Sequence, residues 1–308
     1  PGNCSSDGQT LYVVEGESVQ TAINLAPSGG TVSIAVGDYE GSLNSGGKAI
    51  SIVGTANSNG QPGTRIIADP STSALVCDSG ETSSTLFQNL YITGGDADNG
   101  GGMVIGPVTS GLSSSPTLRN CWFVSNVAAY RGGGVYCGYQ SSPTLEDCHF
   151  GVNTSNGFGG GGMYNYYSSP TLTNCVFTSN EAWDEGGGMY SDHGFVTATD
   201  CTFISNYTFG GGSPGDGGAG GAVYEGENHP QGPSQYVNCV FQDNIASTGG
   251  GIYSFENTLA LIGIEVVSCT FTGNAAVSSG GGMRSGGGPP IVTLSTFVGN
   301  WSGESGGG

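Results

Sequence analysis

Basic residues are scarce in this chain. Only five of its 308 residues are Lys or Arg, against 24 Asp or Glu, which gives a formal net charge of −19 at pH 7. A protein that binds DNA, RNA or an anionic membrane surface uses clustered cationic side chains to displace counterions. The composition therefore argues against nucleic acid as a partner and favours an acidic, well-solvated surface.

Long apolar runs and familiar catalytic signatures are also missing. No hydrophobic run approaches the roughly 18 residues of a membrane-spanning helix, so we expect no membrane span in this chain. The motifs H-E-x-x-H and C-x-x-C do not occur, and the histidines His149, His193 and His229 show no common spacing. A catalytic triad or a zinc site is therefore not expected. The chain starts at Pro1 without a signal peptide, so we expect a processed or trimmed form.

Glycine, by contrast, is abundant. The chain has 60 glycines and 13 prolines, a content that can signal disorder, but no G-X-Y period that would indicate collagen. Hydrophobic residues reach 36% and aromatic residues 9%, and they recur at regular intervals. We therefore expect an ordered repeat rather than a disordered chain.

The repeat has the form F-x-x-N followed by G-G-G. Its seven Phe/Asn pairs are Phe123/Asn126, Phe150/Asn153, Phe177/Asn180, Phe203/Asn206, Phe241/Asn244, Phe271/Asn274 and Phe297/Asn300. The glycine clusters that follow them open at Gly132, Gly160, Gly186, Gly217, Gly249, Gly280 and Gly306. Such a period in a chain with little helical signal predicts a stacked solenoid instead of two globular domains.

Aligned repeats place like residues in columns. A cysteine lies two residues before six of the seven Phe, with Ser295 before Phe297, so both side chains point to one face of a strand; the cysteines are Cys121, Cys148, Cys175, Cys201, Cys239 and Cys269. An apolar column, which we place inside, holds Met103, Val135, Met163, Met189, Val223, Ile252 and Met283. The next residue points outward and is a tyrosine in five repeats: Tyr136, Tyr164, Tyr190, Tyr224 and Tyr253.

These columns predict a parallel β-helix. Three short strands and their turns in about 27 residues would make one coil, and each coil would advance about 4.8 Å along the axis. We predict one all-β domain over residues 1–308, a single-stranded right-handed parallel β-helix of about eleven rungs.

The corners of each coil carry two further expectations. Left-handed backbone is expected at the glycines and at the repeated Asn. The amides of these asparagines would also form an internal ladder from rung to rung. The ladder would consist of Asn126, Asn153, Asn180, Asn206, Asn244, Asn274 and Asn300.

The first 85 residues carry a different pattern, expected to form an N-terminal cap and irregular rungs before the repeats of residues 86–308. Ser18 would cap a short helix with apolar residues at Val19, Ala22 and Ile23. The runs G-G-T-V-x-I-A-x-G-x-Y and G-K-A-I-x-I-x-G follow. This part resembles the N-terminal cap of right-handed parallel β-helices of the pectin-lyase-like superfamily.

The repeats F-x-x-N/G-G-G-[MVI] resemble those of polymorphic outer membrane proteins, which are surface-displayed adhesins. The two resemblances imply the β-helix fold and an extracellular or cell-surface location. They say less about activity, because function depends on sites carried by a fold.

The superfamily resemblance also implies an alternative function for this chain, as an enzyme that cuts acidic polysaccharides. Its lyases combine acidic Ca²⁺ ligands with a basic Arg or Lys, and its hydrolases use carboxylates on neighbouring rungs. The best carboxylate candidates here are Asp184 and Glu185, with Asp216 in the corresponding corner of the next repeat. The simpler interpretation is that these are solvated turn acids.

One acidic segment suits a calcium ion. Asp96, Asp98 and Asn99 form an oxygen-rich loop just before a glycine corner, and Ca²⁺ prefers six to eight oxygen ligands on flexible backbone. The alternative is diffuse binding of Ca²⁺ to the acidic surface, and no other cofactor is expected.

Two interpretations apply to the tyrosine column. Its rings could bind sugars or a partner protein, with Tyr139, Tyr166, Tyr167 and Trp183 adding aromatic surface nearby. The alternative is that stacked aromatic side chains only stabilise the sheet.

The nine cysteines also admit two interpretations. A column inside the β-helix favours a stack of buried thiols, and disulfides between rungs are the alternative. Cys4, Cys77 and Cys137 lie outside the column, and a Cys4–Cys77 disulfide in the cap is possible in an oxidising compartment.

The end of the chain interrupts a repeat at residues 306–308. Either a further segment follows, or the open rung pairs with Thr10–Val14 of the next subunit and builds a head-to-tail filament. We therefore expect a non-catalytic extracellular structural or adhesive protein whose partner is itself or a glycan. The alternatives are a polysaccharide-degrading lyase or hydrolase, and a carbohydrate-binding module that uses the tyrosine column.

Overall fold

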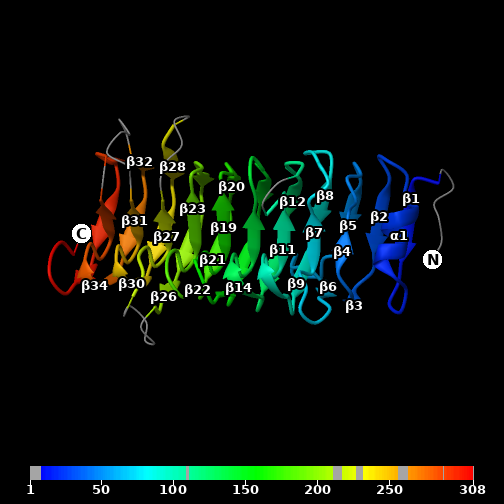
Figure 1. Cartoon of the computed structure of the whole chain (residues 1–308), viewed down its shortest axis with the longest axis horizontal. Coiled ribbons are helices and arrows are strands. Elements are labelled where there is room, and N and C mark those ends of the chain that lie inside the picture. The colour runs from blue at the N-terminus through cyan, green and yellow to red at the C-terminus, as the bar shows by residue number, and fades with distance from the viewer. Residues whose placement is uncertain are drawn as a thin grey trace.

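The protein is a long parallel β-solenoid whose coils stack along one axis, with the N-terminal and C-terminal coils at opposite ends (Figure 1). The computed structural model describes residues 8–108, 111–210, 217–226, 232–255, 263–286 and 288–307. Each coil places one short strand in each of four sheets, numbered here in the order in which the chain visits them.

Sheets 1 and 2 carry the first two strands of each coil. Sheet 1 contains β1 (Thr10–Val13), β2 (Thr31–Ile34), β5 (Ser51–Val53), β8 (Leu86–Gln88), β12 (Thr117–Arg119), β16 (Thr144–Glu146), β20 (Thr171–Thr173), β24 (Thr197–Thr199), β28 (Ser234–Val237), β32 (Ile264–Val267) and β36 (Ile291–Thr293). Sheet 2 contains β3 (Gly37–Glu40), β6 (Thr64–Ile67), β9 (Leu90–Thr93), β13 (Trp122–Val124), β17 (His149–Gly151), β21 (Val176–Thr178), β25 (Thr202–Ile204), β29 (Val240–Gln242), β33 (Thr270–Thr272) and β37 (Thr296–Val298).

Sheets 3 and 4 carry the strands on either side of the glycine corner. Sheet 3 contains β10 (Asp96–Asn99), β14 (Val127–Arg131), β18 (Thr154–Ser155), β22 (Glu181–Ala182), β26 (Tyr207–Thr208), β30 (Ile245–Thr248), β34 (Ala275–Ser279) and β38 (Trp301–Ser302). Sheet 4 contains β4 (Leu43–Asn44), β7 (Leu75–Cys77), β11 (Met103–Ile105), β15 (Val135–Cys137), β19 (Met163–Tyr166), β23 (Met189–Asp192), β27 (Val223–Glu225), β31 (Ile252–Ser254) and β35 (Met283–Ser285).

The parallel solenoid predicted from the repeat is confirmed, with two corrections. Each coil has four strands rather than three, because the residues after the ladder Asn pair as a separate sheet before the chain reaches the glycines. The four sheets hold eleven, ten, eight and nine strands, so the described chain makes about nine turns rather than eleven rungs. The middle coils are complete, whereas the first three coils lack a strand in sheet 3 and the last described coil lacks one in sheet 4.

The predicted helix forms at the N-terminal end. Helix α1 (Val19–Leu25) begins after Ser18, whose hydroxyl accepts a hydrogen bond from the Thr21 N–H at 3.2 Å. Val19 and Ile23 are buried and join the hydrophobic core of the first coils. No helix among the described residues is long and apolar enough to cross a bilayer.

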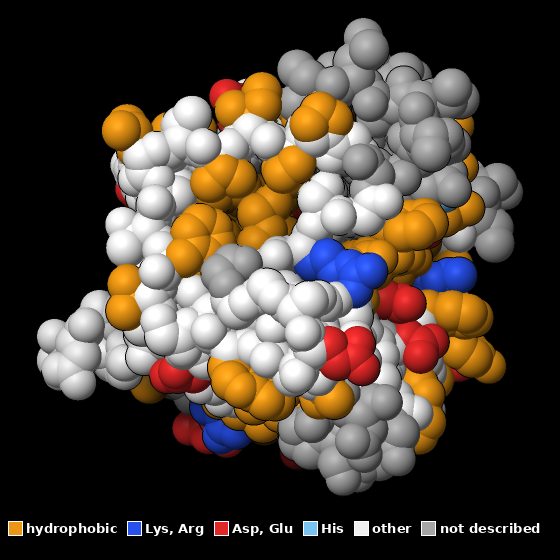
Figure 2. All heavy atoms as spheres, turned by 90° about the vertical axis from the view of Figure 1, so that its left-hand side faces the viewer, with side chains coloured by type: hydrophobic (Ala, Val, Ile, Leu, Met, Phe, Trp, Pro, Cys, Tyr) orange, Lys and Arg blue, Asp and Glu red, His pale blue; other side chains and the backbone are white. Residues whose placement is uncertain are grey.

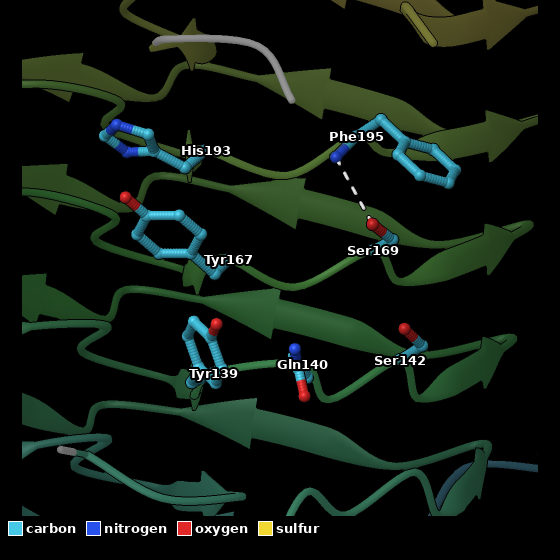
Figure 3. Close-up of a pocket in the computed structure, with 7 residues that line it drawn as sticks. All are labelled: Tyr139, Gln140, Ser142, Tyr167, Ser169, His193 and Phe195. Atoms are coloured by element: carbon cyan, nitrogen blue, oxygen red, sulfur yellow. Dashed lines mark hydrogen bonds between the residues drawn. The ribbon is translucent and has the colours of Figure 1, made fainter. Parts of the chain in front are cut away.

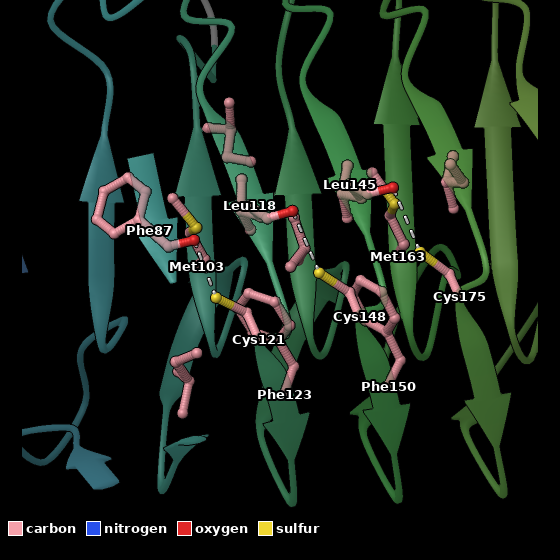
Figure 4. Packing of buried hydrophobic residues seen from close by; sticks show 14 of the residues in the cluster. Phe87, Met103, Leu118, Cys121, Phe123, Leu145, Cys148, Phe150, Met163 and Cys175 are labelled. Atoms are coloured by element: carbon pink, nitrogen blue, oxygen red, sulfur yellow. Dashed lines mark hydrogen bonds between the residues drawn. The ribbon is translucent and has the colours of Figure 1, made fainter. Parts of the chain in front are cut away.

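Identical side chains pile up inside the coils (Figure 4). Rings of the repeated Phe residues stack almost in parallel, with centroids 4.4 to 5.2 Å apart from Phe123 to Phe297. All eight described cysteines are free, buried thiols, and the Cys121 Sγ contacts the Phe87 carbonyl oxygen at 3.4 Å. The thiol stack therefore forms without disulfides between rungs, and Cys4 lies outside the described residues. Viewed end-on over the last coils, hydrophobic side chains gather near the middle of the cross-section (Figure 2).

The repeated asparagines form the predicted ladder along the corner between sheets 2 and 3. Asn180 is typical: its Nδ2 donates to Asn206 Oδ1 and to the Phe150 carbonyl, both at 2.9 Å. Its Oδ1 accepts from the Nδ2 and the backbone N–H of Asn153. Buried amides are stable inside a protein when their hydrogen bonds are satisfied in this way.

The ladder continues without interruption through the last coils. Asn206 Nδ2 donates to Asn244 Oδ1 at 3.0 Å, and Asn244 Nδ2 donates to Asn274 Oδ1 at 2.8 Å. Asn274 Nδ2 in turn donates to Asn300 Oδ1 at 2.9 Å. Asn244 and Asn274 are fully buried, and the longer steps in sequence before them do not disturb their position in space.

The expected left-handed backbone at the ladder asparagines is wrong. None of the seven has positive φ; they are Asn126, Asn153, Asn180, Asn206, Asn244, Asn274 and Asn300. The residue before each of them is left-handed instead, as at Ser125 (57°), Asp243 (52°) before Asn244, and Gly273 (64°) before Asn274. The corner therefore turns one residue earlier, which directs each Asn side chain into the coil.

The glycine clusters leave no room for side chains. The first glycine of each cluster has left-handed φ, as at Gly132 (66°), and a Cβ on Gly161 would lie 2.4 Å from two carbonyl oxygens of the next coil. In the cluster that was expected to open at Gly217, this role falls to Gly220, with φ of 68°. The insertion before it displaces the corner by three residues along the sequence.

Candidate functional site

The outer face of sheet 4 presents the tyrosine column. Tyr136, Tyr164, Tyr190, Tyr224 and Tyr253 share one register position on consecutive coils. Neighbouring rings lie 4.7 to 6.0 Å apart, so the column exists as a continuous ring contact. The expected outward exposure is wrong for two of them: Tyr136 is fully buried and Tyr164 is 2% exposed, whereas the other three are half-buried.

The two buried tyrosines are covered by side chains that reach over from the glycine corner. The Arg131 guanidinium lies 4.8 Å from the ring centroid of Phe158, 5.6 Å from that of Tyr164 and 5.9 Å from that of Tyr166. The Tyr136 hydroxyl has no hydrogen-bond partner among the described residues, and burial raises the pKa of Tyr136 to about 12. The part of the column formed by Tyr136 and Tyr164 is therefore covered by other side chains and does not form an exposed binding surface.

Exposed aromatic side chains line the corner between sheets 3 and 4. Tyr130, Phe158 and Trp183 lie on three successive coils and are 49%, 52% and 41% exposed. The Tyr130 and Phe158 rings are 6.4 Å apart, and Trp183 meets Phe209 of the next coil edge to face at 5.2 Å. We call these four residues the aromatic row. Rows of large exposed apolar side chains mark interaction sites on soluble proteins.

A pocket lies at the opposite edge of the same face, between sheets 4 and 1 (Figure 3). Tyr139, Tyr167 and His193 stand one above another on successive coils, with ring centroids 5.4 and 4.4 Å apart. The other lining residues are Gln140, Ser142, Ser169 and Phe195. The pocket encloses about 270 Å³ and combines aromatic rings with hydroxyl and amide groups. Such a mixture suits a polyhydroxylated ligand.

The pocket corner has left-handed backbone at non-glycine residues. Gln140, Tyr167 and His193 have φ of 57°, 48° and 60°. Strained backbone often accompanies functional sites. Here the same conformation recurs before the column cysteines, as at Asn120 and Asp147, so it is a property of the coil corners and does not by itself identify a site.

Asp192 connects the pocket to the tyrosine column. Its Oδ2 accepts a hydrogen bond from the Tyr164 hydroxyl at 2.9 Å, and its Oδ1 lies 2.5 Å from His193 Nδ1. The carboxyl group is 18% exposed. Burial, and then the charge of Asp192, raise the pKa of Tyr164, so this tyrosine stays a hydrogen-bond donor at neutral pH.

Glu185 lies at the glycine corner that leads into β23. Burial, followed by the nearby carboxyl groups of Asp184 and Asp192, raises the pKa of Glu185 to about 7. Glu185 and Asp192 both act on the Tyr190 ring, whose pKa rises through burial and its charged neighbours. The face therefore brings together a carboxyl group that keeps its proton near neutral pH and a second, hydrogen-bonded carboxyl group.

The other carboxylate candidates predicted from the sequence are Asp184 and Asp216. Asp184 is half-buried beside Glu185, and Asp216 lies outside the described residues. Asp96, Asp98 and Asn99 belong to strand β10 rather than to a loop, because this segment pairs with β14. No cluster of three or more His, Cys, Asp or Glu side chains that could hold a metal occurs among the residues that the structure describes. Calcium binding there stays a prediction.

Sequence reasoning named Trp183 as nearby aromatic surface but missed the other members of the aromatic row and the Asp192–His193 contact. A signal for the row was present, since Tyr130 and Phe158 each precede a left-handed glycine by two residues, and Trp183 precedes one by three. No signal pointed to Asp192, because the equivalent residues of neighbouring coils are not acidic.

A match to a known protein family supports the architecture. A family model described as "Right handed beta helix region" matches residues 67–231, which is more than half of the chain. The crystal structure of an alginate lyase from Paenibacillus sp. str. FPU-7 is similar over 93% of this chain and 99% of that chain, with a TM-score of 0.43 and 11% sequence identity. With a TM-score below 0.5, that similarity carries no argument. No curated protein matches the sequence.

Proposed function

Because the chain belongs to the right-handed β-helix family, we propose that it uses the rigid solenoid to present an extracellular, non-catalytic glycan-binding surface. The observation that carries this proposal is the aromatic row, in which Tyr130, Phe158 and Trp183 stay 41% to 52% exposed on successive coils. Burying such rings is favourable, so leaving three of them in water in register has a cost that binding would offset.

The geometry of the row fits an extended chain. One aromatic side chain per coil repeats about every 4.8 Å along the axis, and the Tyr130 and Phe158 rings lie 6.4 Å apart, so the row runs along the axis as an extended chain would. Tyr and Trp rings stack on the apolar faces of sugars while their polar atoms bond hydroxyl groups. The Tyr139, Tyr167 and His193 pocket provides a parallel line of contacts on the other edge of the face.

The charge of the face favours a neutral glycan over a uronate polymer. The carboxyl groups of Asp184 and Asp192 lie on it, and Arg131 is enclosed by three rings. The whole chain carries a formal net charge of −19, which repels a polyanion further. We therefore expect the surface to act as an adhesive contact to a neutral extracellular polysaccharide.

Removing the row should abolish most of the binding. Replacing Phe158 and Trp183 together by alanine should weaken binding to a neutral polysaccharide at least about tenfold per ring, because an anchoring aromatic contributes roughly 1.4 kcal/mol or more. Affinity electrophoresis in gels that contain galactomannan, xyloglucan, alginate or pectate measures this. We expect retardation only in the neutral gels.

Tyr12→Ala provides a matched control, because Tyr12 is 47% exposed but lies on β1 at the far end of the solenoid. This variant should bind like the wild type. Tyr164→Ala is unsuitable, since Tyr164 is buried and bonded to Asp192, so its loss would also change stability. Unchanged binding by the Phe158/Trp183 variant, or no retardation in any gel, would refute the proposal.

The carboxyl pair supports glycoside hydrolysis as a second candidate function. Glycosidases divide acid and base roles between two carboxyl groups, and Glu185 would be the proton donor, with Asp192 as the second carboxyl group. Release of reducing ends from neutral polysaccharides should then be highest below pH 7, fall as pH rises through about 7, and vanish in Glu185→Gln. A lack of reducing ends between pH 5 and 8 would leave only the binding function.

Stability measurements show whether the loss of hydrolysis in Glu185→Gln comes from unfolding of the variant. The pKa of Glu185 is raised from 4.5 to about 7 in the folded chain, so the folded state holds the proton more tightly and stability falls as pH rises through this range. Glu185→Gln should therefore be at least as stable as the wild type at pH 8. Head-to-tail assembly of the solenoid stays a prediction, since it concerns contacts between copies of the chain.

A further inference from the structure

A second pocket opens on the outer face of sheet 2, on a different side of the coil from the aromatic row. Its floor is formed by Trp122, His149 and Val176, which share one register position on three consecutive coils. Its rim is formed by Asn120, Asp147 and Asn174. The pocket encloses about 380 Å³, enough for a small ring-shaped ligand.

Neither ring recorded beside the Trp122 indole, which forms part of the pocket floor, stacks face to face on it. His149 meets Trp122 edge to face, with centroids 4.9 Å apart and an interplanar angle of 76°, and Tyr91 lies tilted at 6.4 Å. A Cβ on Gly151 would come within 3.2 Å of the His149 ring, so the glycine makes space for the imidazole. Burial lowers the pKa of His149, which keeps the ring neutral at pH 7.

The rim offers donors and acceptors for hydroxyl groups. Asn120, Asp147 and Asn174 have left-handed φ of 46°, 55° and 52°, so their side chains project from the same corner on successive coils. Asn174 Nδ2 donates to Asp147 Oδ1 at 2.6 Å, which leaves the second carboxylate oxygen available for a ligand. Asp147 and Asn174 are exposed.

The charge of the pocket selects against anions. None of its lining residues is Lys or Arg, and Asp147 is its one acidic member. The arginines on either side are engaged: Arg65 pairs with Asp38 at 3.0 Å and Arg119 with Glu146 at 2.6 Å. An apolar ring floor with amide and carboxylate groups at its rim matches an uncharged sugar, which has apolar C–H faces and hydroxyl groups at its edge.

We propose that the Trp122–His149 pocket binds one unit of a neutral glycan independently of the aromatic row, so that a single chain bridges two glycan strands. The sugar would lie against the indole of Trp122, with Asp147 and Asn174 bonding its hydroxyl groups. The two sites face different directions, because the pocket lies on sheet 2 and the row lies at the corner between sheets 3 and 4, and the asparagine corner turns the chain between sheets 2 and 3. The bridging part rests on the proposed glycan binding at the row.

Stoichiometry tests the proposal. Isothermal titration with cellohexaose, mannohexaose and xylohexaose should find two sites per wild-type chain for at least one of them. Trp122→Ala should leave one site, Phe158→Ala with Trp183→Ala should leave one, and the triple variant none. Asp147→Ala, at an exposed position, should weaken the Trp122 site about tenfold without changing thermal unfolding, and Trp122→Phe should retain it.

The outcomes distinguish the two proposals. Two sites in Trp122→Ala, or a single wild-type site that only the Phe158/Trp183 variant removes, would overturn the second pocket and leave the row intact. A single wild-type site that only Trp122→Ala removes would uphold the pocket and overturn the row. Binding of none of the three sugars would overturn both.

Discussion

Replacing Asn180 by leucine should lower the free energy of unfolding by on the order of 4 kcal/mol. The substitution keeps the size of the side chain but removes four hydrogen bonds inside the coil, to Asn153, Asn206 and the Phe150 carbonyl. Each partner stays buried, and a buried polar group without a hydrogen bond costs about 1–3 kcal/mol. Because the ladder is continuous, the loss should reach the coils on both sides of Asn180.

Asn165→Leu is the matched control. Asn165 is also fully buried, but neither its Oδ1 nor its Nδ2 has a hydrogen-bond partner among the described residues. Its replacement removes the cost of burying an unpaired amide and should leave stability unchanged or increase it. Urea denaturation followed by circular dichroism compares the two. Equal losses in both variants would show that size at the position, and not the ladder, governs stability.

Replacing Gly161 by alanine should cost about 3 kcal/mol or more. The new Cβ would lie 2.4 Å from the carbonyl oxygens of Glu181 and Gly187, which belong to the next coil. Both atoms are backbone, so no side-chain rotation can relieve the contact, and the two coils would have to separate locally. Their separation would lengthen the hydrogen bonds that join Gly161 and Gly162 to the next glycine cluster.

Gly60→Ala isolates the effect of backbone conformation. Gly60 has φ of 80°, but a Cβ there would meet nothing within 4 Å. We expect only the cost of left-handed backbone in a residue with a Cβ, roughly 1–2 kcal/mol. Thermal unfolding of both variants measures the difference. A loss in Gly161→Ala no larger than that in Gly60→Ala would contradict the steric account of the glycine corner.

The interior of this protein was predictable because stacking makes it periodic. A residue such as Phe150 lies directly over its equivalents Phe123 and Phe177, so a column in the aligned sequence is a column in space. Burial inside a coil follows from alternation along a strand. The same logic identified the internal positions of the Cys, Met and Asn columns without any knowledge of distant contacts.

The outer faces were less predictable because their residues are not periodic. Tyr136 and Tyr190 occupy equivalent outward positions, yet Tyr136 is buried and Tyr190 is half-buried. The difference comes from a single residue at the adjoining corner, Arg131, whose long side chain lies against Phe158 and over Tyr164 and covers one stretch of the column and not another. An alignment of the repeats does not show which outward tyrosines are buried by side chains from the corners.

The winding of the chain, the inward columns and the need for glycine at the corners were predictable from the sequence, since each depends on a spacing along the chain. Three features required the folded structure: which aromatic rings reach solvent, the cluster of Glu185 with Asp192, and the pocket that Trp122 and His149 line. Exposure and pKa depend on side chains from different corners and coils, whose reach no repeat encodes.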